Sequence, residues 1–351
     1  MTTVGAPAER IALGGAAFFD HAEAAGWTDG LPVLEPTPEA VAALLATVAR
    51  DPAELLGHVP PRWGELTVER AAINAVMAGC RAEVFPVVVA ACEAMLDPAF
   101  NLFAVQATTN PVGPTVIVNG PILNALGISS GAGCLGPGSR ANMTIGRALR
   151  LIMLNPGGAE VGPIDRATHG YPGKLSLCFG EAPGSPWPQL HERRGFAPGD
   201  STVTLFQGTG TFNLLDLVST TPLELLTTIA HSLKGIGSNN MQLQRGEALV
   251  VICPDHARIL AGGGLTIADV QRFLWSGSTV RGHEFPPAMR NLLTRWRPDE
   301  FALVGEQTAV PLVRTPEEIA LVVAGGSGGH SCYVPGFADG ALVTRSIETK
   351  A

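Results

Sequence analysis

Two stretches of the chain share one pattern: "TVIVNGPILNALGI" at residues 115–128 and "LVVICPDHARILAG" at residues 249–262. Each begins with a short apolar run, typical of a buried strand, and continues through a proline-containing turn into a helix. Strands that alternate with helices in this way are typical of α/β proteins. The two stretches therefore predict an α/β fold, and their similarity suggests that the chain contains two related halves.

Strands and helices alternate along the rest of the sequence in the same way. Thr37 and Pro38 predict the start of one helix, and Thr67 predicts a second helix that ends near Gly79. The other predicted elements are a helix near Pro86, strands at 102–109 and 201–207, helices at 122–128, 222–237 and 265–275, and a strand after the helical turn at 315–318. We expect glycine-rich loops at the ends of several of these strands.

A boundary between two lobes is expected where this periodicity fades. Residues 181–200 are rich in proline and glycine and show no helix or strand period, which is typical of a connection. The prediction is an N-terminal extension over 1–27, a first α/β lobe over 28–180 and a second α/β lobe over 201–351.

Composition narrows the class of protein. The 351 residues include 42 glycines and 28 prolines, yet 46% are hydrophobic, which favours an ordered, loop-rich fold over disorder. The net charge of −8 and the absence of basic clusters argue against a nucleic-acid partner. No apolar run approaches the ~20 residues that span a bilayer, and no secretory pattern is seen. We therefore expect a cytoplasmic protein without a membrane partner that acts on a small molecule.

The six cysteines are scattered and form no C-x-x-C pair, so neither a disulfide framework nor a bound metal is expected. Cys92 and Cys253 lie in apolar runs and are predicted to be core residues. Cys80 lies between two helices and next to Arg81, where a thiolate would be favoured, and Arg81 is also a candidate substrate contact. Cys80 is thus either a nucleophile or a small residue that lets two helices pack closely.

A glycine-rich loop runs into a helix in "GISSGAGCLGPGSRANMTIGRALRLI", residues 127–152. Its G-x-G-x-x-G spacing at 131–136 does not follow a strand directly and does not open into a helix at once, so no nucleotide cofactor is predicted. A helix that starts near Arg140 would offer unpaired N–H groups to an anion. The candidates for binding a carboxylate or phosphate are Arg140, Asn142 and Arg147, whereas Arg150 is expected in a structural salt bridge.

Further polar side chains follow predicted strands or helices and could orient a ligand. Those of the first lobe are Thr108, Thr109 and Asn119, and Asn240 belongs to the second. The loop "GGSGGHSC" ends a predicted strand and carries His330 and Ser331. A histidine flanked by glycines is rarely a core residue, so His330 is a candidate acid–base group and Ser331 a substrate contact. His256 is predicted in the first turn of a helix.

Five segments together resemble a poorly characterised bacterial family, the UGSC-type (seleno)proteins, which are sometimes described as thioredoxin-like. The similarity runs from about residue 28 to the C-terminus. The chain has no selenocysteine, and its nearest equivalent of the U-G-S-C tetrad is Gly329-His330-Ser331-Cys332. The segments are "INAVMAGCRAEVFPVVVAA" (73–91), "QATTNPVGPTVIVNGP" (106–121), "GPGSRANMTIGRALRLI" (136–152), "PGKLSLCFGEAPGSPW" (172–187) and "VVAGGSGGHSCYVPGF" (322–337).

These observations predict a cysteine-dependent enzyme that acts on a small polar or carboxylate-bearing metabolite. A hydrolase or a lyase is favoured over a group-transfer enzyme. Cys80 is the expected nucleophile, His330 the acid–base group and Arg140 with Asn142 the anion anchor. A homo-oligomer without cofactor is expected. Three alternatives remain: a thiol-redox protein that uses Cys80, Cys134 or Cys332, a noncatalytic protein that binds a small ligand, and a metal site formed by His330 and cysteines.

Overall fold

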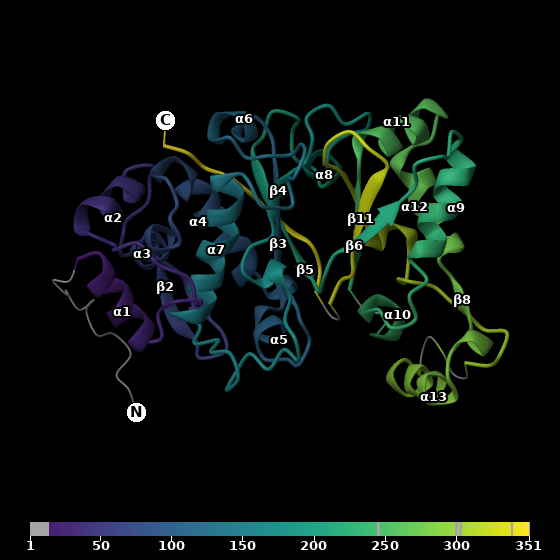
Figure 1. The fold of residues 1–351 in the computed structure, drawn as a ribbon, viewed down its shortest axis with the longest axis horizontal. Coiled ribbons are helices and arrows are strands. Elements are labelled where there is room, and N and C mark those ends of the chain that lie inside the picture. Colours follow the sequence, from purple (N-terminus) through teal and green to yellow (C-terminus); the bar gives the residue numbers. More distant parts are fainter. Residues whose placement is uncertain (1–13, 244–245, 299–300, 302–303, 338–339, 351) are drawn as a thin grey trace.

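The computed structural model describes residues 14–243, 246–298, 301, 304–337 and 340–350, and its main feature is a pair of four-stranded sheets (Figure 1). The first sheet has the order β12–β5–β3–β4 and the second has the order β10–β7–β11–β6. This arrangement of mixed sheets and helices confirms the α/β class. The strands are β3 (Gly113–Asn119), β4 (Cys178–Gly180), β5 (Thr202–Gly208), β6 (Phe212–Leu215), β7 (Ala248–Ile252), β10 (Ile319–Val323), β11 (His330–Val334) and β12 (Val343–Ser346).

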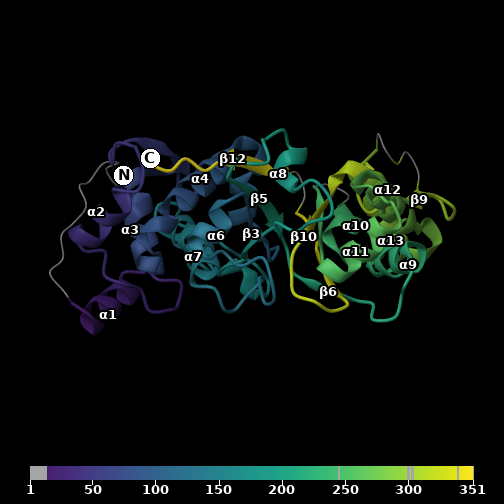
Figure 2. The same cartoon turned by 90° about the horizontal axis from the view of Figure 1, so that it is seen from above.

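The two sheets pack face to face, with helices on their outer sides. Strand side chains alternate between faces, so Val116 and Val118 pack against helices while Ile117 points the other way. Ile117 belongs to one buried cluster with Val251 and Val322 of the second sheet, which forms the layer between the sheets. The covering helices are α3 (Val68–Ala78), α4 (Phe85–Leu96) and α7 (Arg140–Leu154) on the first sheet, and α9 (Pro222–Ser232), α11 (Pro254–Gly262) and α12 (Ile267–Gly277) on the second (Figures 1 and 2).

Both sheets have the same strand arrangement. In the first, β3 pairs in parallel with β4 and antiparallel with β5, and β12 lies antiparallel beyond β5. In the second, β7 pairs in parallel with β10 and antiparallel with β11, and β6 lies antiparallel beyond β11. The strands that carry the repeated sequence pattern, β3 and β7, are thus equivalent, as expected for two related halves.

The outer strands are exchanged between the halves, which corrects the predicted lobe boundary. β6 follows β5 in the chain but pairs with β11, and β12 follows β11 but pairs with β5. β5 and β12 therefore belong to the first sheet although both lie within the predicted second lobe. The chain crosses after Gly208 and returns near Gly336, and these two glycines form a β-bridge. The proline-rich segment 181–200 leads back to the first sheet instead of separating two lobes.

Local sequence signals placed most helices correctly. Thr37 caps α2 (Pro38–Leu45), Thr67 caps α3 and Ser139 caps α7, each through a side-chain oxygen that accepts a backbone N–H. Gly79 ends α3 with a left-handed φ of 89°, so Cys80 lies in the junction before η1 (Ala82–Val84), as predicted.

The predicted strand at 102–109 is wrong, because residues Leu102–Gln106 form a short helix, α5. Asn101 caps this helix, and Leu102, Val105 and Gln106 point to the interior at the helical spacing of three and four residues. A short apolar run does not distinguish a strand from one buried helical turn.

The N-terminal extension predicted over 1–27 is described only from residue 14, where α1 (Ala16–Ala24) packs Phe18 and Ala22 into the first core.

No single described helix is long and apolar enough to cross a membrane, although the bent pair 82–96 and 98–106 meets the criteria of length and composition together. The other elements are β1 (Leu55–Val59), β2 (Gly64–Thr67), η2 (Pro98–Phe100), α6 (Ile122–Leu126), η3 (Pro172–Lys174), α8 (Leu190–Arg193), α10 (Asn239–Leu243), β8 (Val280–Arg281), η4 (Gly282–Glu284), α13 (Pro287–Trp296), β9 (Ala309–Val310) and η5 (Pro316–Glu318).

Candidate functional site

Cys80 has the environment of a core residue and not that of an activated thiol. Its side chain is buried, and its Sγ donates to the main-chain oxygen of Thr144 at 3.3 Å. Burial raises the pKa of Cys80 to about 12, and the hydrogen bond and the charges of Arg140 and Arg147 offset this only in part. The expected thiolate at Cys80 is therefore wrong. Arg81 is exposed and precedes η1, and its charge is not among the influences on this thiol.

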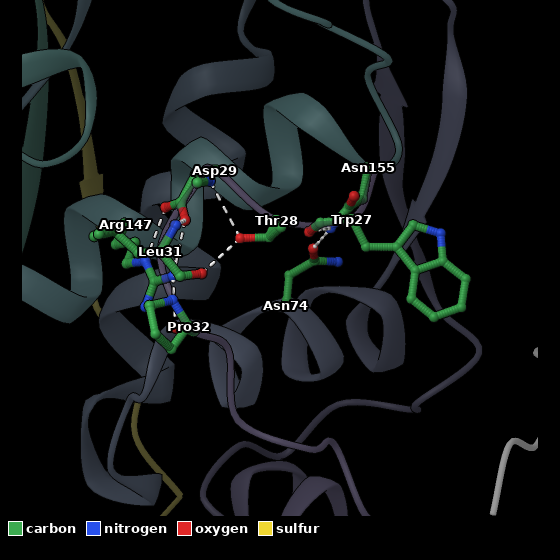
Figure 3. Close-up of polar contacts among 9 residues, drawn as sticks. Trp27, Thr28, Asp29, Leu31, Pro32, Asn74, Arg147 and Asn155 are labelled. Atoms are coloured by element: carbon green, nitrogen blue, oxygen red, sulfur yellow. Dashed lines mark hydrogen bonds and ion pairs between the residues drawn. The ribbon is translucent and has the colours of Figure 1, made fainter. Parts of the chain in front are cut away.

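The arginines of α7 already bind groups of this chain. Arg140 donates through Nε (3.0 Å) and Nη2 (2.9 Å) to the carbonyl of Gly79, at the C-terminal end of α3. Arg147 forms a two-pronged ion pair with Asp29 at 2.8 Å for each contact and also donates to the carbonyls of Leu31 and Pro32 (Figure 3). Both arginines therefore bind groups of the protein itself and stabilise the fold. They do not form the predicted anion-binding site.

Three asparagines predicted as ligand contacts are buried in internal networks. Asn142 exchanges hydrogen bonds with the backbone of Ser129 (2.8 and 2.9 Å) and donates to Cys134, which fixes the glycine loop. Asn240 accepts from the Tyr333 hydroxyl and the Gly336 amide, and donates to the main-chain oxygens of residues 246 and 247. Asn119 donates to Glu181 at 2.7 Å. These contacts position loops.

Thr108, Thr109 and His330 lie apart from these networks. The Thr108 hydroxyl accepts from Asn110 in a turn, and Thr109 is exposed. His330 is the exposed first residue of β11, and its Nδ1 lies 3.1 Å from Asn213 Oδ1. Cys80 belongs to the helical core of the first sheet, so the structure does not bring His330 and Cys80 together.

A different cysteine, Cys253, has an environment that favours a reactive thiol. Cys253 follows β7 and is the N-cap of α11, so its thiol lies at the positive end of a helix. Its amide donates to Ser331 Oγ at 3.1 Å, and its Sγ donates to the Gly328 carbonyl at 2.9 Å. Burial by itself would raise the pKa of Cys253, but the side chain and amide of His256 and the hydroxyl of Ser331 lower it overall. The five other cysteines, all in the described part of the chain, have no lowered pKa.

His256 is held in place from both sides of its ring. Nδ1 lies 2.8 Å from Ser331 Oγ, and Nε2 lies 2.9 Å from the main-chain oxygen of Asp216. A carbonyl only accepts, so Nε2 carries a proton, and in the neutral ring Nδ1 is the basic nitrogen, which accepts a hydrogen bond from the Ser331 hydroxyl. Burial tends to lower the pKa of His256, whereas Cys253 and the Asp216 carbonyl raise it, with a net increase. Cys253 and His256 thus stabilise each other's charged forms.

The site lies where α/β sheets commonly bind ligands, at the carboxyl ends of adjacent parallel strands. Cys253 follows β7, and the glycine loop 324–329 follows β10. The first half contributes as well, because Ala182 donates to the Val323 carbonyl (2.7 Å) and Gly325 donates to that of Ser130 (2.9 Å). The loops of both halves therefore meet beside Cys253, at the N-terminal end of α11.

The sequence contained a signal for the Cys253 site, but the apolar run before Cys253 led to the prediction of a core residue. Cys253 is 2% exposed, and in that sense the prediction of a buried residue was correct. However, Pro254 at the first helical position places Cys253 at a helix N-terminus, and His256 three residues later shares that first turn. His256 was predicted there correctly, but its relation to Cys253 was missed.

No group of three or more histidine, cysteine, aspartate or glutamate side chains that could hold a metal occurs among the residues that the structure describes. Comparisons with known protein families and with curated proteins found no matching family model and no matching protein. The resemblance to the UGSC-type family stays a prediction.

Proposed function

We propose that this protein is a cysteine-dependent enzyme for a small polar or carboxylate-bearing metabolite, with Cys253 in the role that the sequence suggested for Cys80. The observation that carries the proposal is the pairing of Cys253 with His256 at the start of α11, where the pKa of the thiol is lowered against its burial. A thiolate is the nucleophilic form of cysteine, and a nearby imidazole is the usual group that generates it.

In this proposal His256 takes the thiol proton on Nδ1, and the Asp216 carbonyl stabilises the resulting imidazolium through Nε2. The Cys253 sulfur attacks an electrophilic carbon of the substrate and forms a C–S bond, while the bond from that carbon to the departing group breaks and His256 gives this group its proton. Water then attacks the same carbon and gives up a proton to His256, the C–S bond breaks, and His256 returns the proton to the sulfur. Ser331 Oγ holds both the Cys253 amide and the imidazole, so it is a positioning residue. The sequence expectation for Ser331 as a substrate contact is replaced by this internal role.

Access to the sulfur requires a movement of the glycine loop. The Gly328 carbonyl accepts the thiol proton and would repel a thiolate, so this peptide must turn away when Cys253 ionises. Gly325 and Gly328 have φ values of 115° and 135°, which other residues rarely adopt. Glycines at these positions let the loop hold this shape and change it at low cost.

A burst assay with 4-nitrophenyl acetate tests the proposal. The acetyl group would transfer to the Cys253 sulfur, and the ester C–O bond would break to release one nitrophenolate per chain. We expect this burst in the unmodified protein and in Cys80→Ser, and its loss in Cys253→Ser. A burst that persists in Cys253→Ser but disappears in Ser331→Ala would overturn the assignment and make Ser331 the nucleophile.

A thiol-redox protein is the second candidate, and one observation favours it. Cys134 belongs to the buried cluster between the sheets and Cys332 packs against it; burial raises the pKa of Cys332 to about 11, and the charge of Cys134 adds a smaller contribution. All six cysteines are free. Mass spectrometry after mild oxidation would support this candidate if a reversible Cys134–Cys332 disulfide formed.

The location in the cytoplasm and the assembly into homo-oligomers, expected from the sequence, also stay predictions.

A further inference from the structure

A cleft opens beside Cys253, between the start of α11 and the loop after β4. It has a volume of about 250 Å³ and is lined by Ala182, Gly184, Pro186, Pro254, Arg258 and Val323. Pro254 is the residue after Cys253, and Val323 ends the strand next to β7. This volume lies near the lower end of the range for small-molecule pockets, about 300 Å³, and so suits a small metabolite.

The lining of this cleft combines apolar walls with one charge. The alanine, the two prolines and the valine offer carbon surface, and Arg258 is the charged residue among the six. The Arg258 side chain is 72% exposed, and Asp255 is the partner that pairs with it, at 2.7 Å, in the described part of the chain. A guanidinium has five N–H donors, so most of them remain for a ligand.

Asp255 connects this arginine to the loop over the thiol. Its Oδ1 accepts from Arg258, and its Oδ2 accepts from the amide of Gly328 at 2.6 Å. Gly328 in turn accepts the thiol proton of Cys253. A ligand carboxylate on the remaining donors of Arg258 would therefore lie beside Asp255, whose other oxygen binds the loop over the sulfur.

We propose that this cleft is the substrate pocket of the Cys253 site and that it takes a small monocarboxylate with a short apolar body, anchored by Arg258. This inference rests on the proposed function and names its substrate class. The carboxylate would bind the guanidinium, and the apolar body would lie against Pro186, Val323 and Pro254, the last of which is next to Cys253 in the chain.

The test compares alkylation of Cys253 by iodoacetate and by iodoacetamide, which differ in the carboxylate. Peptide mass spectrometry gives the two rates, and their ratio is divided by the ratio for free N-acetylcysteine. Changes in the reactivity of the thiol itself cancel in this normalised ratio. We expect a value of about two to five, the size of effect typical of one largely exposed charge contact.

Arg258→Gln should bring the ratio close to one, whereas Arg272→Gln should leave it unchanged. Arg272 is a matched control, because it pairs with Asp269 three residues earlier, as Arg258 pairs with Asp255, and its side chain is 63% exposed. A ratio near one in the unmodified protein, or one that survives Arg258→Gln, would overturn the carboxylate pocket alone. A Cys253 inert to both reagents would overturn the proposed function, and the pocket inference with it.

Discussion

Asn119 and Cys253 occupy equivalent positions in the two sheets. Each follows the residue that pairs with the end of the neighbouring parallel strand, Val118 with Gly180 in one sheet and Ile252 with Val323 in the other. In the first half this position holds a buried amide that binds Glu181. In the second half it holds a thiol at the start of a helix. The same backbone arrangement thus serves structure in one half and, in our proposal, chemistry in the other.

The structural role of Asn119 gives the first prediction. Asn119→Ala should lower the free energy of unfolding by about 1–3 kcal/mol, because Glu181 is buried and would lose a hydrogen-bond donor. Cys253→Ser should change it by less than about 1 kcal/mol, because serine keeps a donor for the Gly328 carbonyl. Urea denaturation measures both, and equal losses would argue against different roles at the two positions.

Much of the fold could be predicted from local sequence. The predictions failed where contacts between residues far apart in the chain determine the structure. Thr37 and Thr67 act on helices a few residues away, so both caps could be predicted from the sequence. The pairing of β12 with β5 joins residues about 140 positions apart, and no local pattern indicates it. The environment of Cys80 also depends on such packing, since Thr144 on α7 contacts the thiol. The sequence shows that Arg81 is adjacent but not that burial outweighs charge.

Arg147 gives a second prediction about stability. Arg147→Ala should lower the free energy of unfolding by about 3 kcal/mol, since the Asp29 side chain is only 2% exposed and would be left without its cation. Arg62→Ala is the control, because the Arg62–Glu160 pair is largely exposed and should contribute less than about 1 kcal/mol. Similar losses for the two variants in chemical denaturation would contradict the buried ion pair.

Glu247 predicts a pH dependence of stability. Burial raises the pKa of Glu247 to about 7 from an ordinary value of 4.5, so the folded protein holds this proton more tightly than the unfolded chain. The contribution is complete below pH 4.5 and is lost as the pH rises through 7, with an upper limit of roughly 3 kcal/mol at 1.36 kcal/mol per pKa unit.

Glu247→Gln keeps a neutral side chain at every pH and should remove this loss. Thermal unfolding at pH 5 and pH 8 should therefore show a smaller difference in Tm for the variant than for the unmodified protein, and a more stable variant at pH 8. An unchanged difference would show that Glu247 ionises in the folded protein as it does in water.

The glycine loop gives a prediction about backbone shape. Gly328→Ala should destabilise the fold by about 1–2 kcal/mol, because a φ of 135° strains any residue with a Cβ even though no atom lies within 4 Å. Gly235→Ala is the control, since its Cβ also meets no atom and its φ lies outside the left-handed region. Equal Tm values for the two variants would mean that the loop adopts another shape in solution.

The pH dependence of Cys253 labelling tests the central claim most directly. Site-resolved alkylation by iodoacetamide, read by peptide mass spectrometry from pH 5 to pH 10, follows the thiolate of each cysteine. We predict that Cys253 reacts faster than Cys80 at neutral pH, with a midpoint below the ordinary thiol value of about 8.5, and that His256→Gln moves the midpoint upward. Faster labelling of Cys80 than of Cys253, or a Cys253 midpoint that His256→Gln leaves in place, would contradict the account.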